Sequence, residues 1–428
     1  MDAPRIPASV EAVIERLLAD GHRAWAVGGA LRDTVLGRPA RDFDLLVDSP
    51  LAALRRTLPE GRLVGKREPI LKLEARNGRP QIEIASLADR GHSLEADLAS
   101  REFTLNALAF DLRTGVWCDP SQGLADLHAR RLRALDPARI FRADPVRILR
   151  GLRLAGELGL ELDDATRRSM EREAWRLHRA PGERLREELF RILRLAQAAR
   201  VIDELRRRGA LAALLPELLR QVGVLRPGAA VDAFHEGLEL CDAVRPDPLL
   251  RLTALLTGAA TCEAKRYLRR RGEFQLQRAE LRACALVPGV SRRLRLSRRE
   301  TAGLERRLRH QRIEPGDERA ARRMLERVGR DILDDVLELR GAQLALLGAP
   351  PGEWPALEAR IRTLASLTPR VRLAIGGREV MQVLRIRRGP EVGRWLRRLR
   401  WRVVERPEEN ERSKLLGWLQ AAGGTERG

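Results

Sequence analysis

The chain of 428 residues is poor in cysteine and in lysine, with four residues of each type. None of the cysteines forms a Cys-x-x-Cys pair, and none has a pair of histidines close by in the sequence. This spacing is typical of neither a zinc site nor a disulfide framework. Scattered thiols agree with a reducing cytosol.

Long apolar runs are also lacking. No segment approaches the roughly 18 consecutive apolar residues that a membrane-spanning helix needs. The N-terminal segment MDAPRIPASVEAVIERLL contains acidic residues and repeats apolar residues with a helical period, unlike a secretory signal peptide. We therefore expect a cytoplasmic protein with no membrane contact. The sequence leaves the oligomeric state open.

Acidic residues are fewer than basic ones: the chain has 60 Asp and Glu against 81 Lys and Arg, which gives a formal charge of +21. Only four of the basic residues are lysines, so 81 − 4 = 77 are arginines. A genome bias toward arginine accounts for part of this excess. A positive field spread over the whole chain nevertheless predicts contact with a polyanion, most commonly a nucleic acid.

The first third of the chain mixes short apolar runs with short helices. The length of the whole chain, 428 residues, suits two to four domains. Between residues 23 and 135, five runs are typical of strands: RAWAVGG, DFDLLV, RLVGK, ILKLEAR and QIEIASL. We predict an α/β head with a mixed sheet of about five strands and flanking helices.

From Asp136 onward, strand patterns fade and apolar residues recur at i, i+3, i+4 and i+7, as in amphipathic helices. Proline and glycine clusters interrupt these helices. We predict an α/β head at 1–135, an all-α neck at 136–220, a helical body at 221–350 and a helical tail at 351–428.

The stretch AVGGALRDTVLGRPARDFDLLVD carries the first candidate site. Gly28 and Gly29 follow an apolar strand and let backbone N–H groups approach an anion at the start of a short helix. Asp42 and Asp44 lie two residues apart in the next strand, so their side chains share one face. Neighbouring carboxylates repel unless a cation lies between them, and oxygen ligands favour Mg²⁺. Solvated aspartates that protect a strand edge are the alternative.

This stretch resembles the first motif of the class II tRNA nucleotidyltransferases and bacterial poly(A) polymerases, in the polymerase-β-like superfamily. Further segments are similar to later motifs of that family and follow in the family's order: DLASREFTLNALAFD, DPSQGLADL, IFRADPVRILRGLRLAGELGL, GERLREEL and GPEVGRWLRRL. The resemblance implies template-independent transfer of CMP and/or AMP from CTP or ATP to the 3′ end of tRNA, with release of pyrophosphate. Addition of CCA, of CC alone and of A alone all remain open.

The resemblance also implies roles for individual residues. Asp42 and Asp44 would be the catalytic carboxylates and would hold Mg²⁺ in a two-metal arrangement. Nucleotide binding would fall to Gly28, Gly29, Arg32, Arg101, Asp144, Arg147, Arg150 and Arg153. Gly28, Gly29 and Arg32 would hold the triphosphate.

Asp144 and Arg147 would act as an amino-acid template for the base, at i and i+3 on one helix face. A carboxylate accepts from the exocyclic amine of C or A, and a guanidinium donates to the adjacent ring nitrogen. U and G present the opposite pattern and would be rejected. Arg150 and Arg153 continue the stripe and would meet phosphates, with a solvated helix face as the alternative.

Two departures from the family pattern stand out. Ser100-Arg101-Glu102 takes the place of Arg-Arg-Asp, which bears on nucleotide affinity or sugar discrimination. Ala143 takes the place of a Glu that would hold neighbouring arginines, so the template would be looser. Glu83 is either a third carboxylate near the metals or a surface-facing strand residue.

Three rival functions remain. A poly(A) polymerase usually carries a basic low-complexity C-terminal extension, which this sequence does not show. A degenerate, non-catalytic RNA-binding homologue is favoured by the changes at Ser100 and Ala143. A small-molecule nucleotidyltransferase would need neither the charge of +21 nor the long helical body.

Overall fold

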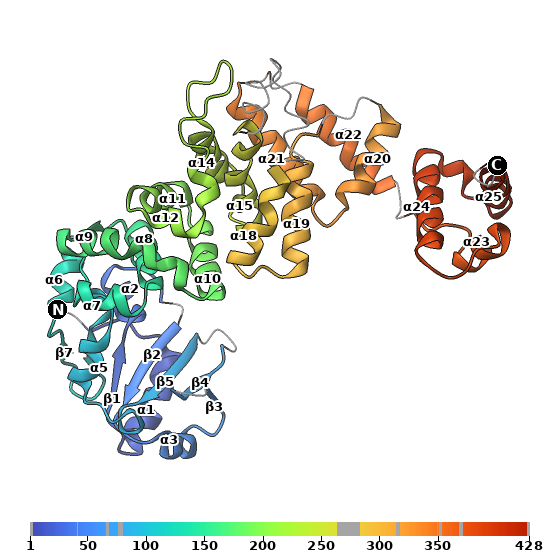
Figure 1. Ribbon diagram of the computed structural model, residues 1–428. Coiled ribbons are helices and arrows are strands. Elements are labelled where there is room, and N and C mark those ends of the chain that lie inside the picture. The colour runs from blue at the N-terminus through green and yellow to red at the C-terminus, as the bar shows by residue number, and fades with distance from the viewer. Residues whose placement is uncertain are drawn as a thin grey trace. The chain divides into compact units, whose positions relative to one another are not determined.

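The computed structural model describes residues 3–40, 42–65, 68–75, 80–262, 283–313, 317–348, 350, 353–367 and 371–425. The chain divides into two compact units, Met1–Pro216 and Glu217–Gly428 (Figure 1). The finer division of the helical part into neck, body and tail stays a prediction.

The first unit is built on a mixed seven-stranded sheet in the order β3-β4-β5-β2-β1-β6-β7. Its strands are β1 (Ala24–Val27), β2 (Asp42–Val47), β3 (Arg62–Val64), β4 (Ile70–Leu73), β5 (Gln81–Ser86), β6 (Ala109–Asp111) and β7 (Trp117–Cys118). Strands β2 and β5 pair in parallel, and every other pair in this sheet is antiparallel. The predicted α/β head with a mixed sheet is confirmed.

The sequence predicted the five strands β1 to β5 and missed β6 and β7. These two strands, Ala-Phe-Asp and Trp-Cys, do not stand out as apolar runs; β3 is as short as β6, but it lies within the apolar run RLVGK. They join the sheet because β6 pairs with the buried strand β1, where Phe110 lies opposite Ala26. Phe110 also packs edge-on against Trp117 of β7.

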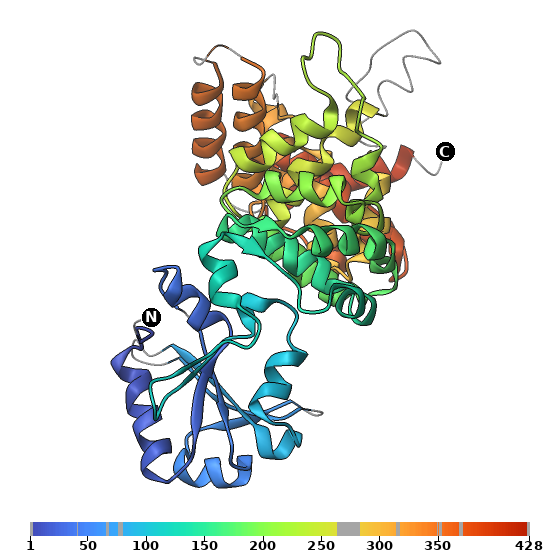
Figure 2. The same cartoon turned by 90° about the vertical axis from the view of Figure 1, so that its left-hand side faces the viewer.

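Helices cover the sheet and create its core. Helix α1 (Ala8–Ala19) buries one apolar side and contacts β1. The helix and this strand are drawn in blue in Figures 1 and 2. Leu98 of α5 (Leu94–Ser100) packs with Trp25 and Leu46 of the two central strands. All four residues of β1 are buried, so the strand leads from the core directly to the glycine pair.

The rest of the first unit is mostly helical. Its helices are α2 (Gly29–Val35), α3 (Leu51–Thr57), α4 (Leu87–Arg90), η1 (Thr104–Asn106), α6 (Gly123–His128), α7 (Pro137–Ala143), α8 (Val146–Leu158), α9 (Asp164–Glu173), η2 (Ala174–Arg179), α10 (Gly182–Leu193), α11 (Ala198–Arg207) and α12 (Ala210–Leu214). Asp136 caps α7, because its side chain accepts from the Arg139 N–H at 3.1 Å. A small parallel pair, β8 (Arg131–Leu132) and β9 (Glu161–Leu162), ties the start of this region to the end of α8.

In the second unit the described residues are mostly helical, as the sequence predicted. These are α13 (Pro216–Leu219), α14 (Ala233–Ala243), α15 (Pro248–Leu256), η3 (Cys284–Leu286), α18 (Val287–Arg293), α19 (Arg298–Arg309), α20 (Glu318–Val328), α21 (Leu333–Leu346), α22 (Glu353–Leu367), α23 (Gly377–Leu384), α24 (Pro390–Glu405), η4 (Pro407–Glu409) and α25 (Arg412–Thr425). None of the helices in the described part of the chain combines the length and the apolar character that a membrane crossing requires.

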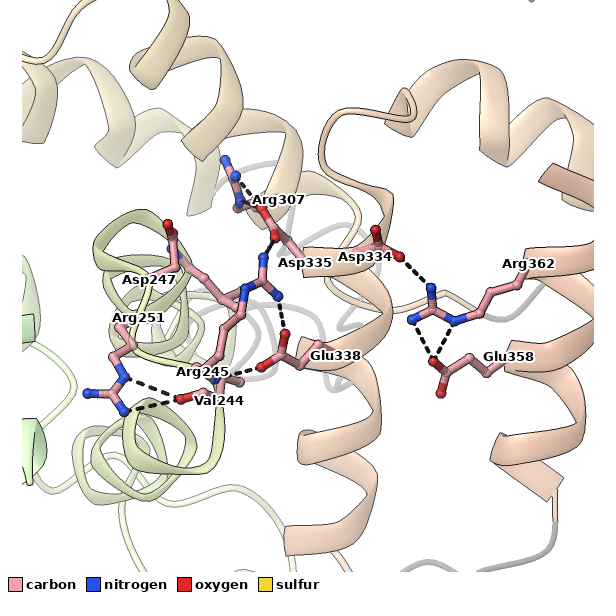
Figure 3. A network of polar contacts seen from close by, with 11 residues as sticks. Val244, Arg245, Asp247, Arg251, Arg307, Asp334, Asp335, Glu338, Glu358 and Arg362 are labelled. Carbon is pink, nitrogen blue, oxygen red and sulfur yellow. Dashed lines mark hydrogen bonds and ion pairs between the residues drawn. The ribbon is translucent and has the colours of Figure 1, made fainter. Parts of the chain in front are cut away.

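A buried carboxylate holds several of these helices together (Figure 3). Asp335 of α21 is 5% exposed and accepts from Arg307 of α19, with its Oδ2 2.7 Å from the Arg307 Nε. It also accepts from Arg245, whose backbone N–H donates to Glu338 at 2.6 Å. Arg245 lies in the turn between α14 and α15, so this network joins four helices at one point.

Candidate active site

Most of the predicted site residues line one cavity of the first unit. The cavity has a volume of about 670 Å³, within the range of about 300–1,000 Å³ that ligand pockets usually have. Its charged lining comprises the arginines Arg32, Arg38, Arg101, Arg150, Arg153 and Arg191 and the acidic residues Asp33, Asp42, Asp44, Glu83, Glu102 and Glu157. The charges of six arginines and six carboxylates balance, so positive and negative side chains lie close together around the cavity.

The two predicted catalytic carboxylates lie at the start of β2 on the same face. Asp42 is exposed and Asp44 is half-buried, while Phe43 between them is 3% exposed and faces the core. Burial raises the pKa of Asp44; the Arg101 charge opposes this, and the charges of Glu83 and Asp42 add to it. Glu83 of β5 is the register partner of Asp44, so it shares that face. It also lies 3.8 Å from Lys72 and accepts from Gln81.

The glycine turn lies directly against Asp44. Gly28 has φ +75° and ψ −139°, a backbone conformation that residues other than glycine rarely adopt. A Cβ atom placed on Gly28 would be 2.9 Å from the Asp44 Oδ2 and 3.2 Å from an Arg101 Nη1. Only glycine therefore lets the end of β1, the carboxylate and the guanidinium meet in this space.

Arg32 and Arg101 converge on Asn106, which the sequence analysis did not single out. The Arg32 Nη1 donates to the Asn106 Oδ1 at 3.0 Å, and the Arg101 Nη1 donates to the Asn106 backbone carbonyl at 3.2 Å. The Asn106 amide in turn donates to Glu102 at 3.1 Å. Asn106 is part of the segment FTLNALAFD. Its side-chain amide, which both donates and accepts hydrogen bonds, is the feature by which the sequence could have indicated a site residue.

Each of these arginines also has a carboxylate partner. Arg32 donates two hydrogen bonds to Asp33, at 3.0 and 2.9 Å. Arg101 donates two to Asp97, at 3.1 and 2.9 Å, and the Asp97 side chain is 6% exposed. The residue in the place of the family's first arginine, Ser100, donates to the Asp97 backbone carbonyl. The two guanidiniums are thus held in fixed orientations before any ligand arrives.

Arg150 and Arg153 of α8 line the same cavity. Arg150 lies 3.4 Å from Glu102, the longer acid of the Ser-Arg-Glu segment. Arg153 lies between two carboxylates, with its Nε 2.8 Å from Glu188 and its Nη1 2.8 Å from Glu157. Its side chain is only 12% exposed, so the alternative of a solvated helix face does not apply to it.

The structure corrects one expectation about Asp144 and Arg147, namely that they share one helix. Helix α7 ends at Ala143, Asp144 has the extended angles φ −143° and ψ 93°, and α8 begins after Pro145. The reason is local, because a residue that precedes proline is disfavoured in the helical region. The pair is still adjacent, with 3.8 Å between the Asp144 Oδ2 and the Arg147 Nε. Among the described residues, those lining the cavity include neither of the two.

The carboxylates suit a divalent cation. Within the described ranges, no group of three or more His, Cys, Asp or Glu side chains is placed to hold a metal ion. Mg²⁺, however, is commonly held by one or two carboxylates together with substrate phosphates. Asp42 and Asp44 provide two such carboxylates. A side chain on Gly28 would fill the space in front of Asp44.

Comparisons with known proteins show which domains and folds this chain is similar to. Residues 24–133 match the family model described as the poly A polymerase head domain, and residues 159–221 match the one described as the probable RNA and SrmB-binding site of polymerase A. The chain is 39% identical over 187 residues to the CC-adding tRNA nucleotidyltransferase of Geobacter sulfurreducens, which is 42% of each protein. It is 35% identical over 218 residues to the multifunctional CCA protein of Xylella fastidiosa, which is 47% of this chain and 52% of the relative.

The chain thus matches about half the length of these two relatives. The fold matches more widely. The Bacillus stearothermophilus CCA-adding enzyme in complex with CTP superposes with a TM-score of 0.67 and 26% identity, over 98% of each chain. The resemblance inferred from the sequence motifs is confirmed.

Proposed function

From the matched domains and the cavity together, we propose that this chain is a nucleotidyltransferase that adds CMP and/or AMP to the 3′ end of tRNA. CTP and ATP would be the nucleotide substrates, and pyrophosphate would leave. The observation that carries the proposal is the contact of the Gly28 turn with Asp44, surrounded by cavity-lining arginines. The tRNA substrate is proposed by analogy with the CC-adding tRNA nucleotidyltransferase to which the chain is similar.

Nucleotidyltransferases of this kind generally depend on a metal ion. In this chain Asp42 and Asp44 would hold it, and we propose Mg²⁺ because the donors are carboxylate oxygens. When bound, the cation would supply charge neutralisation at the phosphates and activation of the primer hydroxyl. The unusual environment of Asp44 fits this role, because a bound cation would compensate a carboxylate that burial disfavours in its charged form.

The arginines would hold the triphosphate. Arg32 and Arg101 lie beside the glycine turn, and Arg150 and Arg153 face the cavity from α8. Their carboxylate and Asn106 partners fix the guanidiniums in advance, so little side-chain entropy would be lost when the nucleotide binds. Gly28 and Gly29 would let the chain approach the phosphates closely.

Asp144 and Arg147 would read the base. One carboxylate acceptor beside one guanidinium donor matches the edge of C and of A, and it mismatches that of U and G. Asp144 lies before α8, on a non-helical backbone, whereas Arg147 lies within α8. The two side chains therefore do not project from one helix surface toward the base. The cytoplasmic location stays a prediction.

A non-catalytic RNA-binding homologue is the second candidate, favoured by Ser100 and Ala143. Against it stands the complete set of cavity-lining groups, including both carboxylates and the four arginines. One experiment separates the two. The protein is incubated with Mg²⁺, each labelled nucleoside triphosphate in turn, and tRNA that lacks CCA, ends in CC or is complete.

Addition of C or A to the incomplete tRNAs supports the proposal, and the tRNA that is extended identifies the product. Untemplated addition of long A tails would instead indicate a poly(A) polymerase. Binding of tRNA without addition of any nucleotide would contradict the proposed activity and favour the non-catalytic homologue.

A further inference from the structure

Asp144 is held by an arginine from a different helix. Arg184, in the first turn of α10, donates from its Nη1 to the Asp144 Oδ1 at 3.1 Å and from its Nη2 to the Asp144 Oδ2 at 2.6 Å. Two parallel hydrogen bonds between a guanidinium and a carboxylate fix the plane of both groups, which a single charge contact does not. The orientation of Asp144 is therefore set from outside its own segment.

The remaining contacts of Asp144 leave one acceptor position open. Its Oδ1 also accepts from the backbone N–H of Val146 at 3.2 Å, so that oxygen has two donors. Its Oδ2 has the short bond to Arg184, and the Arg147 Nε lies 3.8 Å away, beyond hydrogen-bonding distance. A carboxylate oxygen can accept two hydrogen bonds. Within the described structure the Oδ2 can thus take one more donor, next to the guanidinium of Arg147.

We propose that Arg184 is a positioning residue for base selection, which aims the open acceptor of Asp144 beside the donor of Arg147. The inference rests on the proposed function and adds to it the residue that fixes the base-reading carboxylate. It also explains how the segment functions with Ala143 in place of an acidic residue. The interaction that fixes this segment comes from Arg184 of α10, which binds the Asp144 carboxylate directly.

The face of α10 supports this role. Arg184, Glu188 and Arg191 are spaced i, i+4 and i+7, so they lie on one side of the helix. Glu188 accepts from Arg153 at 2.8 Å and pairs with Arg191 at 3.4 Å. Helix α10 therefore contacts both Asp144, just before α8, and Arg153, in the middle of α8.

The test is nucleotide choice rather than activity alone. For Arg184→Ala we expect the preference for the nucleotide that the unaltered protein adds, CTP or ATP, over UTP, measured as the ratio of kcat/KM values, to fall about tenfold, by analogy with the discrimination that one bidentate base contact gives. Arg184→Lys keeps the charge but not the planar fork, so it should recover only part of the preference. Arg200→Ala, which removes an exposed arginine of α11, should leave the preference unchanged.

The variant should fold, because the Arg184 side chain is 50% exposed and exposed ion pairs add little stability. Thermal unfolding checks this, and dissociation constants for CTP and UTP give a second measurement that does not need turnover. A double-mutant cycle shows whether Arg184 acts through Asp144. In an Asp144→Ala background, Arg184→Ala should cause no further loss of preference.

The outcomes are distinct. If the unaltered protein adds no nucleotide to any tRNA, the proposed function fails and the inference fails with it. If the unaltered protein selects C or A and Arg184→Ala keeps that selection, only the inference is overturned. Additive effects of the two substitutions would also overturn it, because Arg184 would then act without Asp144.

Discussion

Gly28 lies so close to Asp44 that a methyl group on Gly28 would come within 2.9 Å of the Asp44 Oδ2. The glycine turn and the carboxylate therefore form one structural feature. The predicted phosphate cradle and the predicted metal ligand cannot be altered independently at this point. Even a methyl group added at Gly28 would therefore displace the Asp44 carboxylate.

For Gly28→Ala we expect nucleotide addition to fall by at least a hundredfold. The new methyl group would displace the Asp44 carboxylate, and the backbone strain would add roughly 1–3 kcal/mol to the energy of the folded state. The control is Gly91→Ala, because Gly91 also has a positive φ, +63°, yet has nothing within 4 Å of a new Cβ. Steady-state addition rates and thermal midpoints should separate strain from crowding. Equal losses in both variants would contradict the assignment.

Removal of either carboxylate should abolish nucleotide addition. Asp42→Asn and Asp44→Asn keep the size of the side chain but halve the charge available to a cation. Removal of divalent ions with EDTA should have the same effect on the unaltered protein, and added Mg²⁺ should restore the rate. Binding of tRNA should change little in both cases. Substantial turnover by the double variant would show that these residues are not the metal ligands.

Arg147→Ala should reduce incorporation of C and A and narrow the gap to U and G. Loss of a two-bond contact with a base corresponds to roughly 1–3 kcal/mol, or about tenfold to a hundredfold in discrimination. All four nucleoside triphosphates should be measured on a tRNA that ends in CC and on one that lacks CCA. An unchanged preference for C and A would mean that Arg147 is only a basic support for RNA.

In the second unit, neighbouring aspartates should differ strongly in their effect on stability (Figure 3). Asp335→Asn would leave Arg245 and Arg307 without their buried anion, and such a loss typically costs about 3–5 kcal/mol. Asp334→Asn breaks only the contact with Arg362, and the Asp334 side chain is 69% exposed, so about 1 kcal/mol or less is expected. Urea unfolding of the two variants provides the comparison. Similar losses would show that the Asp335 network does not organise these helices.

Affinity for tRNA should fall steeply as salt increases, because arginines that contact phosphates release counterions when RNA binds. The preference among nucleotides should stay constant over the same salt range, since it is assigned to short-range contacts of Asp144 and Arg147. Filter binding and single-turnover assays at several KCl concentrations would test both statements. A tRNA affinity independent of salt would contradict the electrostatic interpretation of the charge of +21.

The sequence alone determined the features that depend on near neighbours. Alternation along a strand put Asp42 and Asp44 on one face, and the glycine pair after an apolar run indicated the turn at the end of β1. Strands β1 to β5 were predictable for the same reason, since each lies in a run with a strand-like pattern. The break at Asp144 was also encoded locally, by Pro145, although the helical periodicity on either side concealed it.

Only the tertiary structure decided which distant groups meet. Arg32 and Arg101 share Asn106, and Arg184 holds Asp144 from another helix, although no spacing in the sequence relates these residues. Strand β6 likewise exists because β1 offers it a free edge, not because three residues specify a strand. Periodicity records which side of an element faces the core. The partner of an individual side chain depends on how whole elements pack, which is a sum over many contacts far apart in the chain.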